Sequence, residues 1–291
     1  TLLRAPSLRM LCSFFFFFFS EGNQEGECAP VLAVIHAEGA GAPLFCIHAG
    51  DGGILVYKEL MHHLDGGRPV LGIESPGLRA GADFQVPTIE ETAALYLKTI
   101  RRRQPHGPYL LAGLSYGGTV AYEMAVQLQE EGEEVAFLAL FDTWAPGVRM
   151  IKVGLRERLR RYHRRKAVGG PFEMAFQTAV YFLMRAWQRV FPQPEALPEP
   201  DNNDLQRELR EAHGETMRTY RPRPYPGKLT LFRAMDPGGC VFDFPEDNGW
   251  TGLVDELEII PADGTHDTLF DCRHISGIGK KLQARLQDCR V

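Results

Sequence analysis

The segment "GLSYG" at residues 113–117 constrains the fold of this chain more than any other feature. An apolar run, residues 109–114, comes directly before its serine, and a second apolar run follows. This context fits the G-x-S-x-G nucleophile elbow, in which a strand turns tightly into a helix. Gly113 and Gly117 leave room for the turn, which lifts the Ser115 hydroxyl out of the sheet. The pattern predicts Ser115 as a nucleophile, with a glycine-rich packing turn as the alternative.

Apolar runs alternate with amphipathic stretches from Pro43 onward. The runs predict strands at residues 43–50, 68–77, 109–115, 135–142, 228–236 and 257–263. Helical spacing predicts helices at residues 54–64, at 88–104, from about 116, and at 275–289. Thr88 followed by Glu91 is a capping box for the second of these helices. The alternation predicts an α/β fold with a mostly parallel sheet, helices on both faces, and ligands beyond the carboxyl ends of the strands.

A long insertion interrupts this alternation. About 80 residues, 148–227, separate two predicted strands that a short helix could connect. Connections of this length are usually functional, so we expect a lid over the site.

A serine nucleophile needs a base, and in this kind of fold the base is a histidine that follows the serine and the acid in the chain. His266 comes just after the strand predicted at 257–263, at the carboxyl edge of the sheet, and is the predicted base. The other later histidines are interpreted as surface or capping residues: His163 in a basic run, His213 in a polar helix and His274 at the start of the last helix.

Two aspartates compete for the role of the acid that orients His266. Asp142 and Asp236 each end a predicted strand. Asp236 precedes a proline and two glycines, where an aspartate commonly forms a turn. The insertion begins shortly after Asp142 in the chain and would cover a site there. We therefore favour Asp142 and keep Asp236 as the alternative.

Acyl transfer also needs N–H donors for the developing oxyanion. The backbone N–H of Tyr116, directly after the nucleophile, is one predicted donor. Gly50, in the loop "HAGDGG" at 48–53, is the other, because small residues let the backbone come close. His48 in that loop is interpreted as structural rather than catalytic.

Composition excludes several other classes of protein. A net charge of −5 and a pI of about 6.0 argue against a nucleic-acid binder. The six cysteines form no CxxC pair and no metal-ligand spacing, which favours reduced thiols in a cytoplasmic protein without a metal site. No apolar stretch approaches the ~20 residues of a membrane helix.

Residues 1–30 are expected to be an unstructured or non-native segment. Six consecutive phenylalanines, Phe14 to Phe19, show neither helical nor strand periodicity. Three interpretations remain open: a translated pyrimidine-rich non-coding stretch, a targeting segment, and a linker.

The motifs together resemble the thioesterase domains that end polyketide and nonribosomal peptide synthases. The resemblance covers residues 31–291 and rests on "PLFCIHAGDGG", "LAGLSYGGTVAYEMA", "ALFDTWAPG", "YRPRPYPGKLTLFRA", "DNGW" and "GTH". It implies an α/β-hydrolase fold, a helical lid, no cofactor bound by the domain, and a carrier protein that delivers acyl groups on phosphopantetheine. It also supports Asp142, whereas stand-alone editing and fatty-acyl thioesterases more often use the later position, here Asp236. "ADGTHDT" departs from the commoner Gly-Asp-His or Gly-Asn-His.

Two segments of the insertion have a functional and an ordinary interpretation. Apolar side chains near one helical face predict either a wall for a long acyl chain or plain packing onto the sheet: Phe172, Phe176, Leu183, Trp187 and Phe191. The stretch 149–166 carries nine Lys and Arg residues against one Glu. It is either a solvated face or a docking strip for an acidic carrier protein, with its densest charge at Arg160, Arg161, Arg164 and Arg165.

The leading hypothesis is a serine thioesterase that releases a carrier-bound polyketide or peptide by hydrolysis or cyclisation, with the carrier upstream in the same synthase. An editing or fatty-acyl thioesterase, or an esterase acting on free esters, is the enzymatic alternative. A catalytically silent carrier-docking module is the non-enzymatic one. The presence of Ser115, Asp142 and His266 together argues against it.

Overall fold

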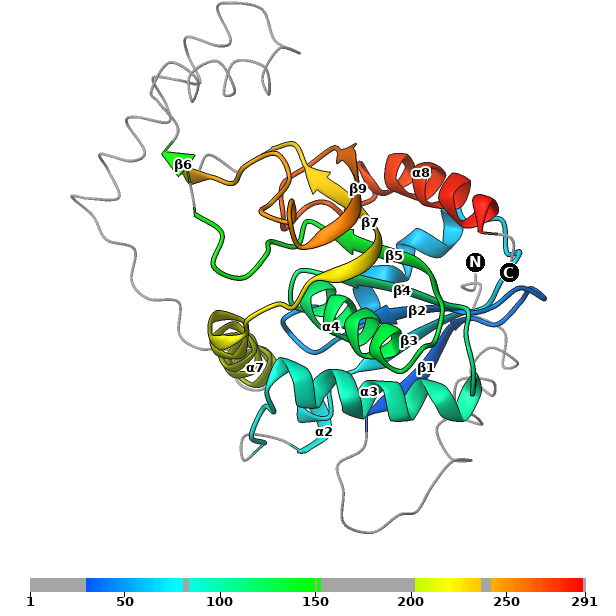
Figure 1. The fold of residues 1–291 in the computed structure, drawn as a ribbon, viewed down its shortest axis with the longest axis horizontal. Helices are drawn as coiled ribbons and strands as arrows, with labels where there is room; N and C mark the ends of the chain where they lie inside the picture. Colours follow the sequence, from blue (N-terminus) through cyan, green and yellow to red (C-terminus); the bar gives the residue numbers. More distant parts are fainter. Residues whose placement is uncertain (1–29, 81–83, 150, 153–201, 237–241, 290–291) are drawn as a thin grey trace, which may run out of the picture.

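The computed structural model describes residues 30–80, 84–149, 151–152, 202–236 and 242–289. Its centre is a seven-stranded sheet with the order β1-β3-β2-β4-β5-β7-β9 (Figure 1). The strands are β1 (Val31–His36), β2 (Leu44–Ile47), β3 (Val70–Glu74), β4 (Tyr109–Leu114), β5 (Val135–Phe141), β7 (Tyr225–Ala234) and β9 (Val254–Ala262). Strand β1 runs antiparallel to β3, and the other neighbouring pairs are parallel.

Helices cover both faces of this sheet. The α-helices are α2 (Gly77–Ala80), α3 (Ile89–Arg103), α4 (Tyr116–Glu130), α7 (Asn202–Thr219) and α8 (Ile275–Asp288). Buried side chains of α3 and α4 form one apolar cluster with the sheet, and those of α8 belong to a second cluster. Strand β4 separates the two clusters: Leu111 lies in the first, whereas Leu110 and Ala112 lie in the second. This alternation follows from the two-residue period of a strand that is buried on both faces.

The predicted strands and most of the predicted helices are present. The capping box is confirmed, since Thr88 Oγ1 accepts from the Glu91 N–H at 3.2 Å and Glu91 Oε2 accepts from the Thr88 N–H at 3.0 Å. Strand β1 was not predicted. Its segment VLAVIH contains an apolar run, but the strand lies at the sheet edge and its residues are only half-buried.

The expected helix at residues 54–64 is wrong in type. The chain forms two 3-10 turns there, η1 (Leu55–Tyr57) and η2 (Glu59–His63). The buried residues of this segment are Ile54, Tyr57 and Leu60. Their spacing of three matches the repeat of a 3-10 helix. Tyr57 also positions the neighbouring strand ends. Its hydroxyl donates to Ile47 O at 2.7 Å and accepts from the Leu114 N–H at 2.8 Å, directly before Ser115.

The insertion is described at its two ends. Near its start, β6 (Ile151–Lys152) pairs antiparallel with β8 (Phe242–Asp243). Near its end, α7 leads into β7 (Figure 1). Strand β7 begins three residues before the predicted start at 228. Within the described ranges, no helix has the length and apolar character needed to cross a membrane.

Candidate active site

Ser115 occupies a strained turn between β4 and α4. Its backbone has φ 56° and ψ −117°, a region that residues with a side chain rarely adopt. Hydrogen bonds on both sides hold this conformation. The Ser115 N–H donates to Phe141 O at 3.1 Å, and the Ser115 carbonyl accepts from the Gly118 N–H at 3.0 Å.

Three glycines make the turn sterically possible. A Cβ on Gly113 would lie 2.2 Å from the Gly117 carbonyl, and a Cβ on Gly117 would lie 2.2 Å from His48 O. A Cβ on Gly118 would lie 1.9 Å from Thr143 Oγ1. The first two glycines are those of the sequence motif. The need for Gly118 comes from Thr143, which follows a neighbouring strand.

The Asp142 side chain is fixed in place after β5. The residue is 5% exposed, has φ 42°, and donates its N–H to Phe232 O at 2.8 Å. Its Oδ1 accepts from the Ala234 N–H at 2.9 Å, and its Oδ2 lies 2.9 Å from His266 Nδ1. The structure therefore brings Asp142 and His266 together, and β7 holds the carboxylate in its orientation.

His266 is held by a ring stack as well as by this hydrogen bond. It follows β9 through Gly264, whose φ is +102°. The imidazole stacks on Trp144 with ring centroids 4.5 Å apart, and Trp144 stacks in turn on Phe244 at 4.7 Å. A carboxylate only accepts hydrogen bonds, so Nδ1 carries the proton and Nε2 is left as the basic nitrogen. Sequence reasoning missed Trp144, although it stands two residues after the candidate acid.

Asp236 lies after β7, close in sequence to the segment that holds Asp142. Its N–H donates to Gly264 O at 3.0 Å, which ties the end of β7 to the turn before His266. In the described structure, the hydrogen bond at His266 Nδ1 is made with Asp142.

His213 of α7 contacts the loop of Gly50. His213 was expected to be a solvated surface residue, and this is wrong: it is 2% exposed. Its Nδ1 lies 2.7 Å from Gly50 O, so a residue of α7 contacts the loop that follows β2. The sequence signal was weak, because the helix around His213 is rich in charged residues and only its inner face is buried.

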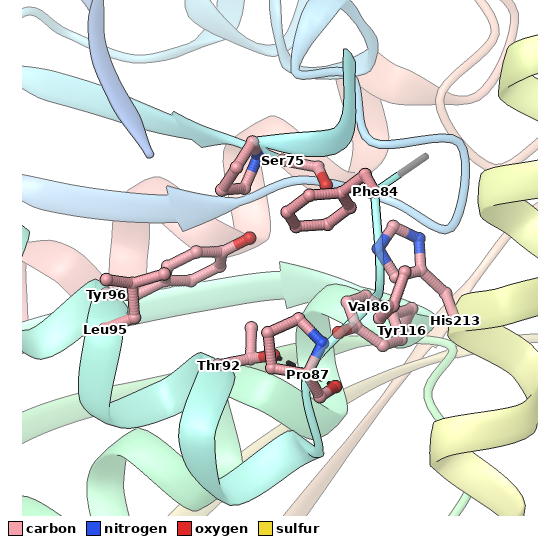
Figure 2. A pocket seen from close by; sticks show the side chains of 10 residues that line it. Ser75, Phe84, Val86, Pro87, Thr92, Leu95, Tyr96, Tyr116 and His213 are labelled. Carbon is pink, nitrogen blue, oxygen red and sulfur yellow. Dashed lines mark hydrogen bonds between the residues drawn. The ribbon is translucent and has the colours of Figure 1, made fainter. Parts of the chain in front are cut away.

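A small pocket is lined in part by Tyr116, the residue after Ser115. Figure 2 shows its lining side chains, with Tyr96 of α3 on one side and His213 of α7 on the other. The lining residues are Ser75, Pro76, Phe84, Val86, Pro87, Thr92, Leu95, Tyr96, Tyr116 and His213. Since Tyr116 follows Ser115 in the chain, this mostly apolar pocket lies beside the elbow.

The predicted lid and docking residues lie outside the described residues. These are Phe172, Phe176, Leu183, Trp187 and Phe191, and Arg160, Arg161, Arg164 and Arg165. Among the described residues, no group of three His, Cys, Asp or Glu side chains is placed to hold a metal ion.

The fold and the arrangement at its carboxyl edge define an α/β-hydrolase: an elbow after one central strand, an acid after the next, and a histidine after the last. The family follows from comparison with known proteins. Residues 42–163 match the family model described as Thioesterase domain.

Curated relatives and solved structures agree with this match. The chain is 31% identical over 272 residues to malpinin synthetase of Mortierella alpina, covering 92% of this chain and 3% of that protein. It is 30% identical over 256 residues to enterobactin synthase component F of Escherichia coli K12, covering 86% of this chain and 18% of that protein. The crystallised NocB thioesterase domain is 26% identical, with a TM-score of 0.63 over 88% of this chain and 99% of that chain. The chain thus carries a thioesterase domain similar to those of peptide synthetases, as its motifs predicted, and spans a small part of these curated relatives.

Proposed function

We propose that this domain takes an acyl or peptidyl chain from the phosphopantetheine of a carrier protein onto Ser115, and then releases it by hydrolysis or cyclisation. The hydrogen bond between His266 Nδ1 and Asp142 Oδ2 is the observation that carries the proposal. In the neutral imidazole this bond keeps the proton on Nδ1 and leaves the lone pair on Nε2, which is the tautomer that a general base for Ser115 requires.

The first half of the reaction transfers the acyl group. The Ser115 Oγ attacks the thioester carbonyl carbon while His266 Nε2 takes the hydroxyl proton. The carbonyl oxygen becomes an oxyanion, for which the N–H groups of Tyr116 and Gly50 are the proposed donors. When the tetrahedral intermediate collapses, the C–S bond breaks, and the imidazolium returns its proton to the departing pantetheine thiol.

The second half releases the product. Water, or a hydroxyl or amine of the acyl chain itself, attacks the ester carbon, and His266 accepts its proton. The C–O bond to Ser115 then breaks, and Ser115 regains a proton from His266. In this proposal, the apolar side chains around Phe172 to Trp187 line the path of the acyl chain, and the basic run around Arg160 to Arg165 meets the carrier protein.

The relatives support a carrier-bound substrate. One of the compared proteins is a synthetase by name and another is a synthase component, and the chain covers only a small part of each. The NocB thioesterase domain forms a covalent complex with a fluorophosphonate analogue of nocardicin G, which suits a nucleophilic mechanism.

Covalent labelling tests the proposal directly. A fluorophosphonate probe should label the wild-type chain at Ser115, and the label should be absent from Ser115→Ala. Ser276→Ala, a serine of α8, is the matched control and should be labelled like the wild type. Acyl-pantetheine thioesters should be turned over by the wild type and by Ser276→Ala only, with products identified by mass spectrometry. Labelling that survives Ser115→Ala would contradict the proposal.

A further inference from the structure

Two buried histidines contact the peptide units on either side of Gly50. His48, at the end of β2, places its Nδ1 2.7 Å from Ala49 O, and His213, on α7, places its Nδ1 2.7 Å from Gly50 O. A carbonyl oxygen only accepts hydrogen bonds, so both Nδ1 atoms carry a proton and donate it. The Nε2 of His48 lies 2.6 Å from the Tyr96 hydroxyl, which donates to it. Each imidazole therefore has a fixed orientation.

These hydrogen bonds determine the direction of the Gly50 N–H. The Ala49 carbonyl and the Gly50 N–H belong to one planar peptide unit, and the Gly50 carbonyl belongs to the next unit. The Ala49 oxygen also accepts from the Gly52 N–H at 3.0 Å. With both neighbouring carbonyls held, neither peptide unit can rotate without breaking a buried hydrogen bond. A glycine without such contacts would have wide conformational freedom.

The same two rings contact the residue that supplies the other proposed oxyanion donor. Tyr116 stacks on His213 with ring centroids 4.1 Å apart, and on His48 at 5.4 Å. The two imidazoles are 5.1 Å apart. Figure 2 shows Tyr116 next to His213, the side chain that projects from α7. His48, Tyr116 and His213 thus form one aromatic cluster, and its two histidines bond to the carbonyls on either side of the Gly50 N–H.

Both histidines of the cluster are neutral at physiological pH. Burial lowers the pKa of His48 to about 3, and the neighbouring His213 acts in the same direction. Burial also lowers the pKa of His213, although its hydrogen bond to Gly50 and the nearby Asp51 partly oppose this. Neutral imidazoles can hold the loop without placing a positive charge next to the developing oxyanion.

We propose that His213 is a positioning residue of the oxyanion hole: its hydrogen bond to Gly50 O holds the Gly50 N–H toward the developing oxyanion, and its stack on Tyr116 supports the imidazole beside the second proposed donor. The inference rests on the proposed function and extends it. It assigns α7, which lies within the last part of the predicted lid insertion, a role in forming the hole. The hydrogen bond from His213 links α7 to the Gly50 loop.

A pair of substitutions separates the hydrogen bond from the ring stack. His213→Phe keeps a ring against Tyr116 but has no donor for Gly50, whereas His213→Asn places an amide N–H near the position of Nδ1 and has no ring. Loss of a direct oxyanion donor lowers kcat by about 10²–10³. A misplaced donor should cost less, so we expect His213→Phe to lower kcat by about 10- to 100-fold on an acyl-pantetheine thioester, with KM within about threefold. His213→Asn should stay within about fivefold of the wild type in kcat.

A transition-state mimic gives a second readout. A trifluoromethyl ketone analogue of the acyl chain forms an anionic adduct with a serine nucleophile, and its Ki should rise in His213→Phe in proportion to the loss of kcat/KM. His62→Phe, the same change at an exposed histidine, is the control and should alter neither value. Turnover is normalised to the sites that the fluorophosphonate labels at completion, so that misfolded protein is not counted. His213→Leu is the second donor-free variant if His213→Phe does not fold.

The outcomes distinguish this inference from the proposed function. A wild-type chain without labelling or thioester turnover would overturn the proposed function itself. An active wild type with equal kcat in all His213 variants would overturn only the positioning role. Equal losses in the Phe and Asn variants, with a lower Tm or a changed KM, would also overturn it, because they would show that His213 only anchors α7.

Discussion

At the scale of single residues, the site depends on two strained positions held by backbone hydrogen bonds. Ser115 and Asp142 both have positive φ, and each is fixed by a contact to a neighbouring strand, Ser115 to Phe141 and Asp142 to Phe232. Asp142 is further restricted, since one carboxylate oxygen accepts from Ala234 and the other faces His266. Because each carboxylate oxygen of Asp142 has its own partner, a substitution by Asn can test which aspartate is the acid.

Asp142→Asn should almost abolish turnover. The Ala234 N–H will keep the amide oxygen of the Asn on its side, so the NH₂ group will face His266 Nδ1 and favour the wrong tautomer. The same kind of change lowers kcat by about 10⁴ in a serine protease. We expect a loss of that order, with little change in Tm, from steady-state kinetics and thermal denaturation.

Asp236→Asn is the matched comparison. Turnover should remain within about tenfold of the wild type, because His266 Nδ1 bonds to Asp142 and the substitution keeps the bond from the Asp236 N–H to Gly264 O. The opposite ranking of the two variants would make Asp236 the acid. It would then favour an editing or fatty-acyl thioesterase over a domain that ends a synthase.

At the scale of elements, α4 is connected to the end of the insertion by a buried carboxylate. Glu123 on α4 has no exposed surface. It accepts hydrogen bonds from the Tyr220 hydroxyl and from Arg223 Nη2, both at 2.6 Å. Burial and the neighbouring Glu123 raise the pKa of Tyr220, so its hydroxyl stays protonated and donates. The chain between α7 and β7 is thereby attached to the helix that begins at the nucleophile.

Removing the Tyr220 hydroxyl should destabilise the domain. Hydrogen bonds to charged groups contribute about 1.5–3 kcal/mol, and Tyr220→Phe leaves one oxygen of a buried carboxylate without this donor. We expect the free energy of unfolding to fall by that amount in urea titrations, with kcat of the folded protein unchanged. Tyr225→Phe removes a hydroxyl for which the described residues provide no hydrogen bond, and should cost less than about 0.5 kcal/mol. Equal losses in both variants would contradict a special role for the bond to Glu123.

At the scale of the whole molecule, the chain carries uneven charge. It has a net charge of −5, yet nine of its 32 basic residues fall within residues 149–166. The proposed function requires a carrier protein as partner. Whether the basic run contacts it stays a prediction, and attraction between opposite charges acts mainly on the rate of encounter.

Reversing the charge of the run tests this contact. Changing Arg160, Arg161, Arg164 and Arg165 to Glu should lower kcat/KM for an acyl-carrier protein by about 10-fold or more at low salt, and by less at high salt. Small acyl-pantetheine thioesters should react as before. Arg102→Glu with Arg103→Glu, at the end of α3, is the control for a general change of charge. Unchanged kinetics with the carrier substrate would restore the interpretation of a solvated face.

The sequence by itself determined the features that depend on neighbouring residues. The order of strands and helices, the capping box at Thr88 and the elbow at Ser115 all follow from local periodicity and turn chemistry. The family could be recognised for the same reason, since its motifs are short and each surrounds one turn or strand end. The helix expected at 54–64 failed because an apolar spacing of three or four does not by itself separate an α-helix from successive 3-10 turns.

Only the tertiary structure decided which side chains meet. Asp142 and His266 are 124 positions apart in the chain, and Gly50 and His213 are 163 apart. The sequence offered two strand-end aspartates and favoured Asp142 over Asp236, and in the structure the packing of β5 against β7 places Asp142 against His266. His213 looked like a surface residue because its neighbours in sequence are polar, but burial depends on which face of α7 lies against the Gly50 loop. Contacts over such separations arise from the packing of whole elements, which local patterns do not encode.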